Sequence, residues 1–263
     1  MILTLEGAFT HTVTGNLVLE AGARVEANGQ GYAGSTGPNP GCAGLNGGGG
    51  GHGGHGGAGG MGIQAGAFDD SGLLPTQPGS GGGHGASSPG GAGGGLVWFQ
   101  VASTCQIEGT VEADGEAGVP HTAGGVGGGG AGGTIRFSCG TFSGAGSLSA
   151  NGGNGGGDLS AGCCAPNNGT GGGGSGGRIV VRSIDHGLFS GKASARVDGG
   201  TGGTGPGIQG AAGGRGTIAF ITLSALSDPL TTVTTAEDVD IEIYQGWRWE
   251  PSQDAPFNYN SVC

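Results

Sequence analysis

The chain has 263 residues, of which 73 are glycine and only 10 % are charged, and its formal net charge is −11. Disordered chains are usually kept unfolded by high charge, so much glycine with little charge indicates a different class of protein. Lys192 is the single lysine. We therefore expect no nucleic-acid partner and no anionic-membrane surface, and without a run of 18 apolar residues we expect no membrane span.

The N-terminal stretch MILTLEGAFTHTV does not have the basic region and long apolar segment of a signal peptide. Three explanations stay open at this point: a signal that has been removed, a chain that is a piece of a longer one, or export without a signal.

Four short apolar runs follow glycines and define a repeat of roughly forty residues. They are GGLVWFQVA, GGTIRFSCG, GGRIVVRSI and RGTIAFITL, starting at residues 94, 132, 176 and 215. Apolar residues two positions apart predict strands with one face turned inward. The inward residues are expected to be Leu96 and Trp98, Ile135 and Phe137, Ile179 and Val181, and Ile218 and Phe220.

A second strand is predicted in each repeat, over residues 24–29, 110–115, 147–152 and 195–200. Each of these segments ends in Asn-Gly or Asp-Gly. Both dipeptides tolerate positive φ, so a turn is expected where each second strand ends.

The glycine tracts that separate the strands have a period of three. Glycine recurs at every third position in three series: 41 to 62, 124 to 133, and 207 to 216. Three residues per turn is the geometry of the polyproline-II helix, and bare glycine faces let such helices pack side by side. We expect residues 47–62 to form one such rod; flexible loops on a small solenoid are the alternative.

The fold class predicted from these patterns is all-β: a right-handed parallel β-helix, or β-solenoid, with a polyglycine-II bundle and essentially no α-helix. Two domains are expected, a glycine-rich repeat unit over residues 1–227 and an acidic, aromatic segment over 228–263 that serves as a cap or docking element. Candidate assembly residues lie at the two ends: Ile2, Leu3, Leu5, Tyr244, Trp247, Trp249, Phe257 and Tyr259.

Six cysteines in a chain with so little core favour disulfides and an oxidising compartment. The candidates are Cys42, Cys105, Cys139, Cys163, Cys164 and Cys263, and their pairing stays open. Asn168 begins the sequon Asn-Gly-Thr and is a candidate glycosylation site.

No motif in the sequence indicates catalysis, a cofactor or a metal. The G-x-S-x-G match at residues 173–177 precedes a strand and has no helix after it. The many GxGxxG matches have no βαβ frame. His52 and His55 are three residues apart and would share one ridge of a threefold helix, and His84 lies further along the sequence. We expect these histidines to be exposed rather than metal-bound.

The modules GGGGAGGTIRF and GGGGSGGRIVV, followed by SLSANGG and ARVDGG, resemble the glycine-rich repeats of large secreted and cell-surface proteins. A more distant resemblance is to the polyglycine-II tips of phage tail fibres. The resemblance implies an extracellular structural or adhesive role. We expect a non-enzymatic subunit of a head-to-tail filament or surface layer; an adhesin for a receptor or glycan, and an ice-binding protein, are the alternatives.

Overall fold

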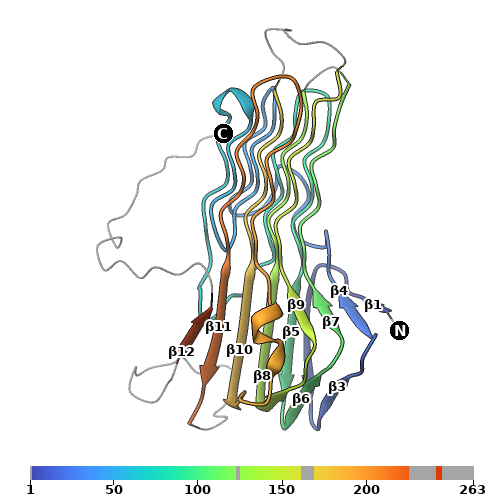
Figure 1. Cartoon of the computed structure of the whole chain (residues 1–263), viewed down its shortest axis with the longest axis vertical. Coiled ribbons are helices and arrows are strands. Elements are labelled where there is room, and N and C mark those ends of the chain that lie inside the picture. The colour runs from blue at the N-terminus through green and yellow to red at the C-terminus, as the bar shows by residue number, and fades with distance from the viewer. Residues whose placement is uncertain (1, 123–124, 161–168, 225–240, 245–263) are drawn as a thin grey trace, which may run out of the picture.

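The computed structural model describes residues 2–122, 125–160, 169–224 and 241–244, with only the backbone of the last four. Within these residues the fold is mostly β and contains no α-helix, as expected. Strands fill one half of the long axis, and extended glycine tracts run side by side through the other half (Figure 1).

Twelve strands and two short 3-10 helices make up the described secondary structure. The strands are β1 Ile2–Thr4, β2 Ala8–Val13, β3 Leu17–Leu19, β4 Arg24–Glu26, β5 Leu96–Val101, β6 Thr104–Ile107, β7 Thr110–Glu112, β8 Thr134–Ser143, β9 Ser147–Ser149, β10 Arg178–Asp185, β11 Thr217–Thr222 and β12 Ile241–Tyr244. The 3-10 helices are η1 Gly60–Gly62 and η2 Ser190–Ser194.

Two parallel sheets organise these strands. The four-stranded sheet has the order β1-β4-β7-β9. The eight-stranded sheet has the order β12-β11-β10-β8-β5-β2; β6 also pairs with β8, and β3 pairs with β6. Every pairing is parallel except that of β12, which lies antiparallel to β11. Successive repeats therefore stack strand on strand, and the predicted repeat is confirmed at this level.

The first repeat was aligned one residue out of phase in the sequence prediction. Val97 and Phe99, not Leu96 and Trp98, lie in register with Ile135 and Phe137 on β8. The run Leu-Val-Trp-Phe is apolar throughout, so its alternation gives no phase. Trp98 instead lies on the outer face of the sheet, where the Arg136 guanidinium stacks 4.0 Å from its ring centre.

The core lies between the two sheets and is made of rows of like residues. Phe99 and Phe137 stack with ring centres 5.6 Å apart, and Phe142 packs on Phe137 at 5.1 Å. From the four-stranded sheet, Val111 and Leu148 pair in register and are buried in the same cluster. In-register stacking thus lets each repeat bury its apolar residues against those of its neighbours.

The Asn-Gly and Asp-Gly dipeptides do not turn the chain as predicted. Of the glycines that follow, only Gly29 has positive φ, and the chain otherwise runs on into the glycine tracts. The side chains of Asn28, Asp114 and Asn151 form a ladder instead, in which Oδ1 of each residue accepts the backbone N–H of the equivalent residue in the next repeat. The bonds are Asp114 N to Asn28, Asn151 N to Asp114 and Asp198 N to Asn151, at 2.6 to 2.8 Å.

The fourth predicted second strand, over residues 195–200, is reduced to a single bridge between Arg196 and Ser149. The 3-10 helix η2 leads into it, so its first residues leave the sheet. Val197 is nevertheless fully buried in the core cluster.

The glycine tracts bond to one another through their backbones with a period of three residues. In residues 171–176, three successive N–H groups bond three different segments, and the next three repeat the pattern. The bonds are Gly171 to Gly156, Gly172 to Gly47, Gly173 to Ala211, Gly174 to Gly153, Ser175 to Gly50 and Gly176 to Gly214, each N to O at 2.8 to 3.0 Å. The tracts are therefore ordered by mutual hydrogen bonding.

Residues 47–62 do not form one rod, which corrects the sequence interpretation. Gly49 N bonds Gly57 O at 2.9 Å and His52 N bonds Gly54 O at 3.2 Å, so the chain reverses near residue 53. Glycine at every third position suits the segments on both sides of the reversal, so the period alone cannot locate it.

Close approach of the backbones is what requires glycine in the tracts. A Cβ on Gly174 would lie 2.0 Å from the carbonyl oxygen of Gly130, and one on Gly173 would lie 2.1 Å from that of Gly200. Real Cβ atoms do not come this close to backbone, so an added methyl group would push two tracts apart and break their hydrogen bonds.

We predict that Gly174→Ala lowers the free energy of unfolding by about 1–3 kcal/mol, the usual effect of overpacking a filled interior. The matched control is Gly15→Ala, where nothing lies within 4 Å of the added Cβ. Thermal unfolding followed by circular dichroism measures both. Equal melting temperatures for the two variants would contradict the packing described above.

The ladder residue Asp114 gives a pH-dependent prediction. Burial raises the pKa of its carboxyl, while hydrogen bonds from Ser149 and Asn151 act against that shift. The folded-state pKa of Asp114 is higher than its unfolded-state pKa. The free energy of unfolding therefore falls as the pH rises from the unfolded pKa through the folded pKa, and this loss is absent in acid below both values.

We therefore expect Asp114→Asn, which keeps an Oδ1 acceptor, to raise the melting temperature at pH 7 and to lose this advantage as the pH approaches 3. Melting curves of the variant and the wild-type protein between these pH values test the sign. The prediction would be refuted if the difference in melting temperature between variant and wild type were smaller at pH 7 than at pH 3.

Candidate functional site

The structure places the N-terminal assembly candidates in different environments. Ile2 and Leu3 are 61 % and 42 % exposed on the edge strand β1. Leu5 is 5 % exposed and joins the core, because its N–H continues the pairing with β4 by bonding Glu26 O. Leu5 is therefore not a surface residue, which corrects the prediction.

The C-terminal assembly candidates are largely untested. Tyr244 lies in β12 opposite Ile218, so this part of the predicted second domain extends the sheet of the first. Trp247, Trp249, Phe257 and Tyr259 lie outside the described residues, as does the predicted boundary at residue 228.

The described cysteines are not joined to one another. Cys105 and Cys139 are free thiols, contrary to the expectation that they take part in disulfides, and both are buried in the core. Contact with Cys139 and burial raise the pKa of the Cys105 thiol far above its usual range, so it stays protonated. Cys42 is buried and is not one of the free thiols; Cys163, Cys164 and Cys263 lie outside the described residues.

The short motifs fall inside the glycine tracts. Asn168 lies outside the described residues, but Thr170 of its sequon is buried and donates its hydroxyl to Gly203 O at 2.7 Å. Ser175 of the G-x-S-x-G match is also buried, and its Oγ accepts the N–H of His52 at 3.0 Å.

The three histidines do not form one group. His52 is fully buried, which contradicts the expectation that it is exposed, whereas His55 and His84 are exposed. No group of three or more metal-ligating side chains occurs within the described part of the chain.

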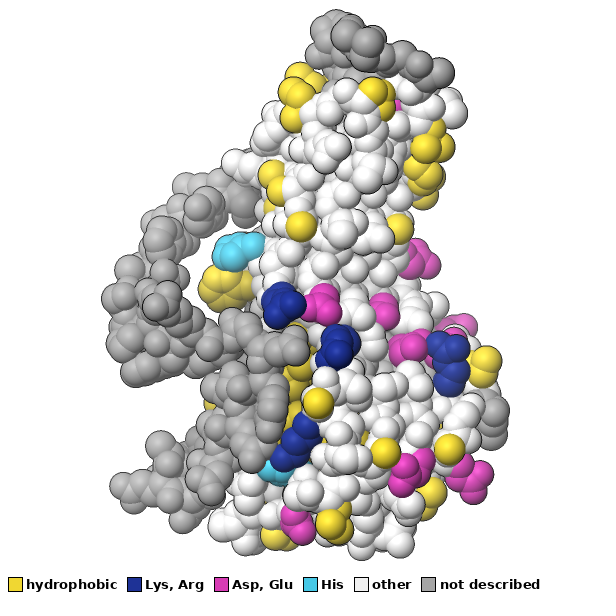
Figure 2. All heavy atoms as spheres, in the orientation of Figure 1, with side chains coloured by type: hydrophobic (Ala, Val, Ile, Leu, Met, Phe, Trp, Pro, Cys, Tyr) yellow, Lys and Arg dark blue, Asp and Glu magenta, His cyan; other side chains and the backbone are white. Residues whose placement is uncertain are grey.

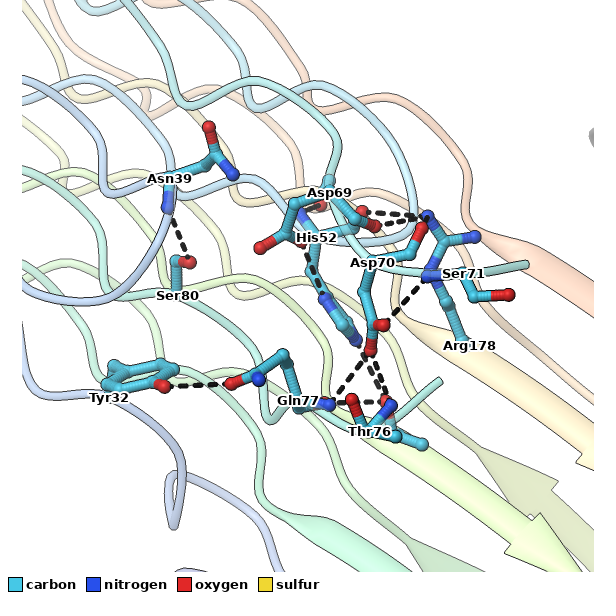
Figure 3. A network of polar contacts seen from close by, with 12 residues as sticks. Tyr32, Asn39, His52, Asp69, Asp70, Ser71, Thr76, Gln77, Ser80 and Arg178 are labelled. Carbon is cyan, nitrogen blue, oxygen red and sulfur yellow. Dashed lines mark hydrogen bonds and ion pairs between the residues drawn. The ribbon is translucent and has the colours of Figure 1, made fainter. Parts of the chain in front are cut away.

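His52 is the centre of a polar network where the glycine tracts meet the strands (Figure 3). Its Nδ1 lies 2.9 Å from Asp69 Oδ1, and its Nε2 lies 2.9 Å from Oγ1 of Thr134, the first residue of β8. The reversal near residue 53 brings the His52 ring into this position, beside the segment 69–77 that crosses the sheet.

Arg178, the first residue of β10, fixes the same segment from the other side. Its Nη2 donates to the carbonyl oxygens of His52, Asp69 and Asp70, and its Nη1 donates to Thr217 Oγ1 at 3.0 Å. Burial lowers the pKa of Arg178, and the nearby Asp70 and Asp69 oppose that shift.

Asp70 organises the loop that follows. Its φ is +62°, a left-handed conformation that Asp tolerates better than most residues. Oδ1 accepts the N–H of Ser71, and Oδ2 accepts those of Thr76 and Gln77 at 2.6 and 2.8 Å (Figure 3). The carboxylate thereby closes the loop on itself and holds Gln77 beside Thr134.

The order Asp69, His52, Thr134 resembles the acid, base and hydroxyl of a nucleophilic triad, but the hydrogen bonds run in the opposite sense. Thr134 Oγ1 donates to the Gln77 carbonyl at 2.8 Å, and a carbonyl can only accept. The Thr134 oxygen therefore accepts from His52 Nε2, so the imidazole cannot act as the base that removes its proton. Thr134 is also fully buried, without access for a substrate.

Sequence reasoning missed this network almost completely. Asp69, Thr134 and Arg178 carry no motif, and their spacings of 65 and 44 residues follow from the excursion and the repeat length. The one available signal was the register of the repeats, since Thr134, Arg178 and Thr217 occupy equivalent positions.

No family model, curated protein or solved structure matches this chain. No helix in the described residues has the length and apolar character needed to span a membrane.

We predict that Asp69→Ala lowers the free energy of unfolding by about 1–3 kcal/mol, because it leaves His52 Nδ1 buried without a partner. The control is Asp198→Ala, which removes an exposed ion pair with Arg215 and should change stability by less than about 1 kcal/mol. Chemical denaturation measures both; similar effects would show that the buried network contributes little.

Proposed function

We propose that the protein is a non-enzymatic, extracellular structural subunit, built as a right-handed parallel β-solenoid that carries a polyglycine-II bundle. The in-register parallel pairing of equivalent strands supports the solenoid. The threefold hydrogen bonding of residues 171–176 supports polyglycine II, since a helix with three residues per turn directs successive N–H groups to three neighbours.

The observation that carries the structural role is the open edge of the first repeat. Among the described residues, strands β1, β2 and β3 each pair on one side only, with β4, β5 and β6. Ile2, Leu3 and Val18 are exposed on these strands. Unpaired strand edges with exposed apolar residues favour pairing with another chain.

We propose that a second copy of the chain adds to this edge and so produces a filament or layer. A head-to-tail contact needs a complementary surface at the other end. There, the outer side of β11 is occupied by the antiparallel strand β12. The second half of the contact is assigned to the aromatic C-terminal segment, on the basis of its sequence.

A second candidate function is adhesion to a receptor or glycan. Four exposed apolar residues occur in the glycine tracts: Met61, Val119, Leu159 and Ile208. Hydrophobic side chains gather around the far end of the bundle in Figure 2. Contacts between Gly60 and Thr170 and between Gly169 and Ile208 place three of these tracts together.

We predict that the double variant Ile2→Lys/Val18→Lys remains monomeric at concentrations where the wild-type protein assembles, because charges at an open edge prevent strand addition. Negative-stain electron microscopy and sedimentation velocity over a concentration series measure assembly. The matched control is Leu188→Lys, which changes an exposed residue outside the edge strands.

Assembly that persists in the double variant would reject the edge as the contact. A wild-type protein that stays monomeric throughout would favour the adhesin. In that case Leu159→Lys and Ile208→Lys should reduce binding to cells or glycans, and the edge variant should not.

A further inference from the structure

The outer face of the eight-stranded sheet carries a cluster of buried donors that have no hydrogen-bond partner among the described residues. Trp98 lies on β5, Arg136 on β8 and Arg182 on β10; together they are named the Trp98–Arg136–Arg182 cluster. It lies on the face turned away from the solenoid core and does not include the His52 network.

The strand register places the three side chains on one face. Trp98 and Arg136 are direct partners across β5 and β8. Arg182 is paired with Ser138, two residues after Arg136, and residues two apart on a strand point to the same side. The cluster therefore follows a diagonal across three neighbouring strands.

All three side chains contain a buried nitrogen without a hydrogen bond. These atoms are Trp98 Nε1, Arg136 Nε and Arg182 Nε. Arg136 is 3 % exposed and Arg182 is 8 % exposed. The small remaining exposure of both residues leaves part of each side chain in contact with solvent.

Within the part of the chain that the structure describes, no carboxylate is bonded to either positive charge. Burial lowers the pKa of Arg136 to about 10, and repulsion from Arg182 adds to this effect, while Asp70 acts against it. Burial also lowers the pKa of Arg182. Both groups are still charged at neutral pH, and buried charges in proteins are normally paired.

Stacking on Trp98 holds Arg136 in place but leaves its hydrogen-bonding edge open. The guanidinium carbon lies 4.0 Å from the ring centre, the arrangement of a cation–π contact. Such a contact compensates part of the charge but bonds none of the N–H groups. The Nη groups of Arg136 are therefore held in a fixed orientation.

We infer that the Trp98–Arg136–Arg182 cluster binds a small oxyanion, such as sulfate, phosphate or the carboxylate of a small solute. A guanidinium group presents two parallel N–H donors that match two oxygens of such an anion. Arg136 and Arg182 supply these pairs through their Nη groups, and Trp98 holds the Arg136 guanidinium in place by stacking. The low exposure of both arginines limits the ligand to a small group.

This site does not depend on the proposed structural role. A filament subunit and an adhesin could both contain it, so loss of assembly and loss of anion binding are separate results.

The test uses sodium sulfate as the probe at constant ionic strength, with sodium chloride as the balancing salt. We expect isothermal titration calorimetry to show saturable binding of sulfate to the wild-type protein with one site. We also expect the melting temperature to rise with the logarithm of the sulfate concentration above Kd, by about 3–6 °C at tenfold excess over Kd.

Arg182→Gln should abolish both the sulfate binding isotherm and the rise in melting temperature that accompanies binding. It should also be at least as stable as the wild-type protein in chloride alone, since the variant loses an unpaired buried charge rather than a bond. Arg215→Gln is the matched control, because its guanidinium is exposed and its removal should leave sulfate binding unchanged.

Two results would overturn the inference. One is a rise in melting temperature that is linear in sulfate and equal in Arg182→Gln, which is the general effect of an excluded salt. The other is the absence of a binding isotherm in wild type. If Arg182→Gln does not fold, Arg136→Lys gives a second test: it keeps the charge but loses the paired donors, and sulfate should bind it more weakly.

Discussion

This structure depends on hydrogen bonds between glycine backbones. These backbones lie closer together than any Cβ atom would permit. The strands determine where those backbones begin. Gly133 and Gly177 directly precede β8 and β10, and their carbonyl oxygens accept the N–H groups of Arg178 and Thr217 in the next repeat. The strand ladder thus continues into the tracts without interruption, so the register set by side chains in the core is passed to segments that have none.

This dependence explains which features of the fold could be predicted from sequence. The repeats, the parallel strands and the absence of α-helix in the described residues follow from apolar residues at two-residue spacing. The phase of Leu96 to Phe99 did not, because four consecutive apolar residues fit either face. The ladder of Asn28, Asp114 and Asn151 was read as a series of turns, since side-chain bonding between repeats and positive φ favour the same residue types.

The candidate site was less accessible to prediction for a related reason. His52 was placed on an exposed ridge because glycine at every third position continues through residue 53, where the chain in fact reverses. Its partners Asp69 and Thr134 come from a loop and from another repeat. Only the three-dimensional arrangement of the excursion over residues 29–95 brings them together, and no local pattern encodes that arrangement.

The bundle also has a consequence for how other proteins can act on it. Residues 127–133 and 169–177 contain no lysine, arginine or aromatic residue, and their peptide groups are already bonded to neighbouring tracts. An endoprotease needs a free extended segment and a side chain to fill its specificity pocket. The glycine half of the molecule offers neither along these residues, so the composition that makes the chain look like a linker would also shield it from digestion.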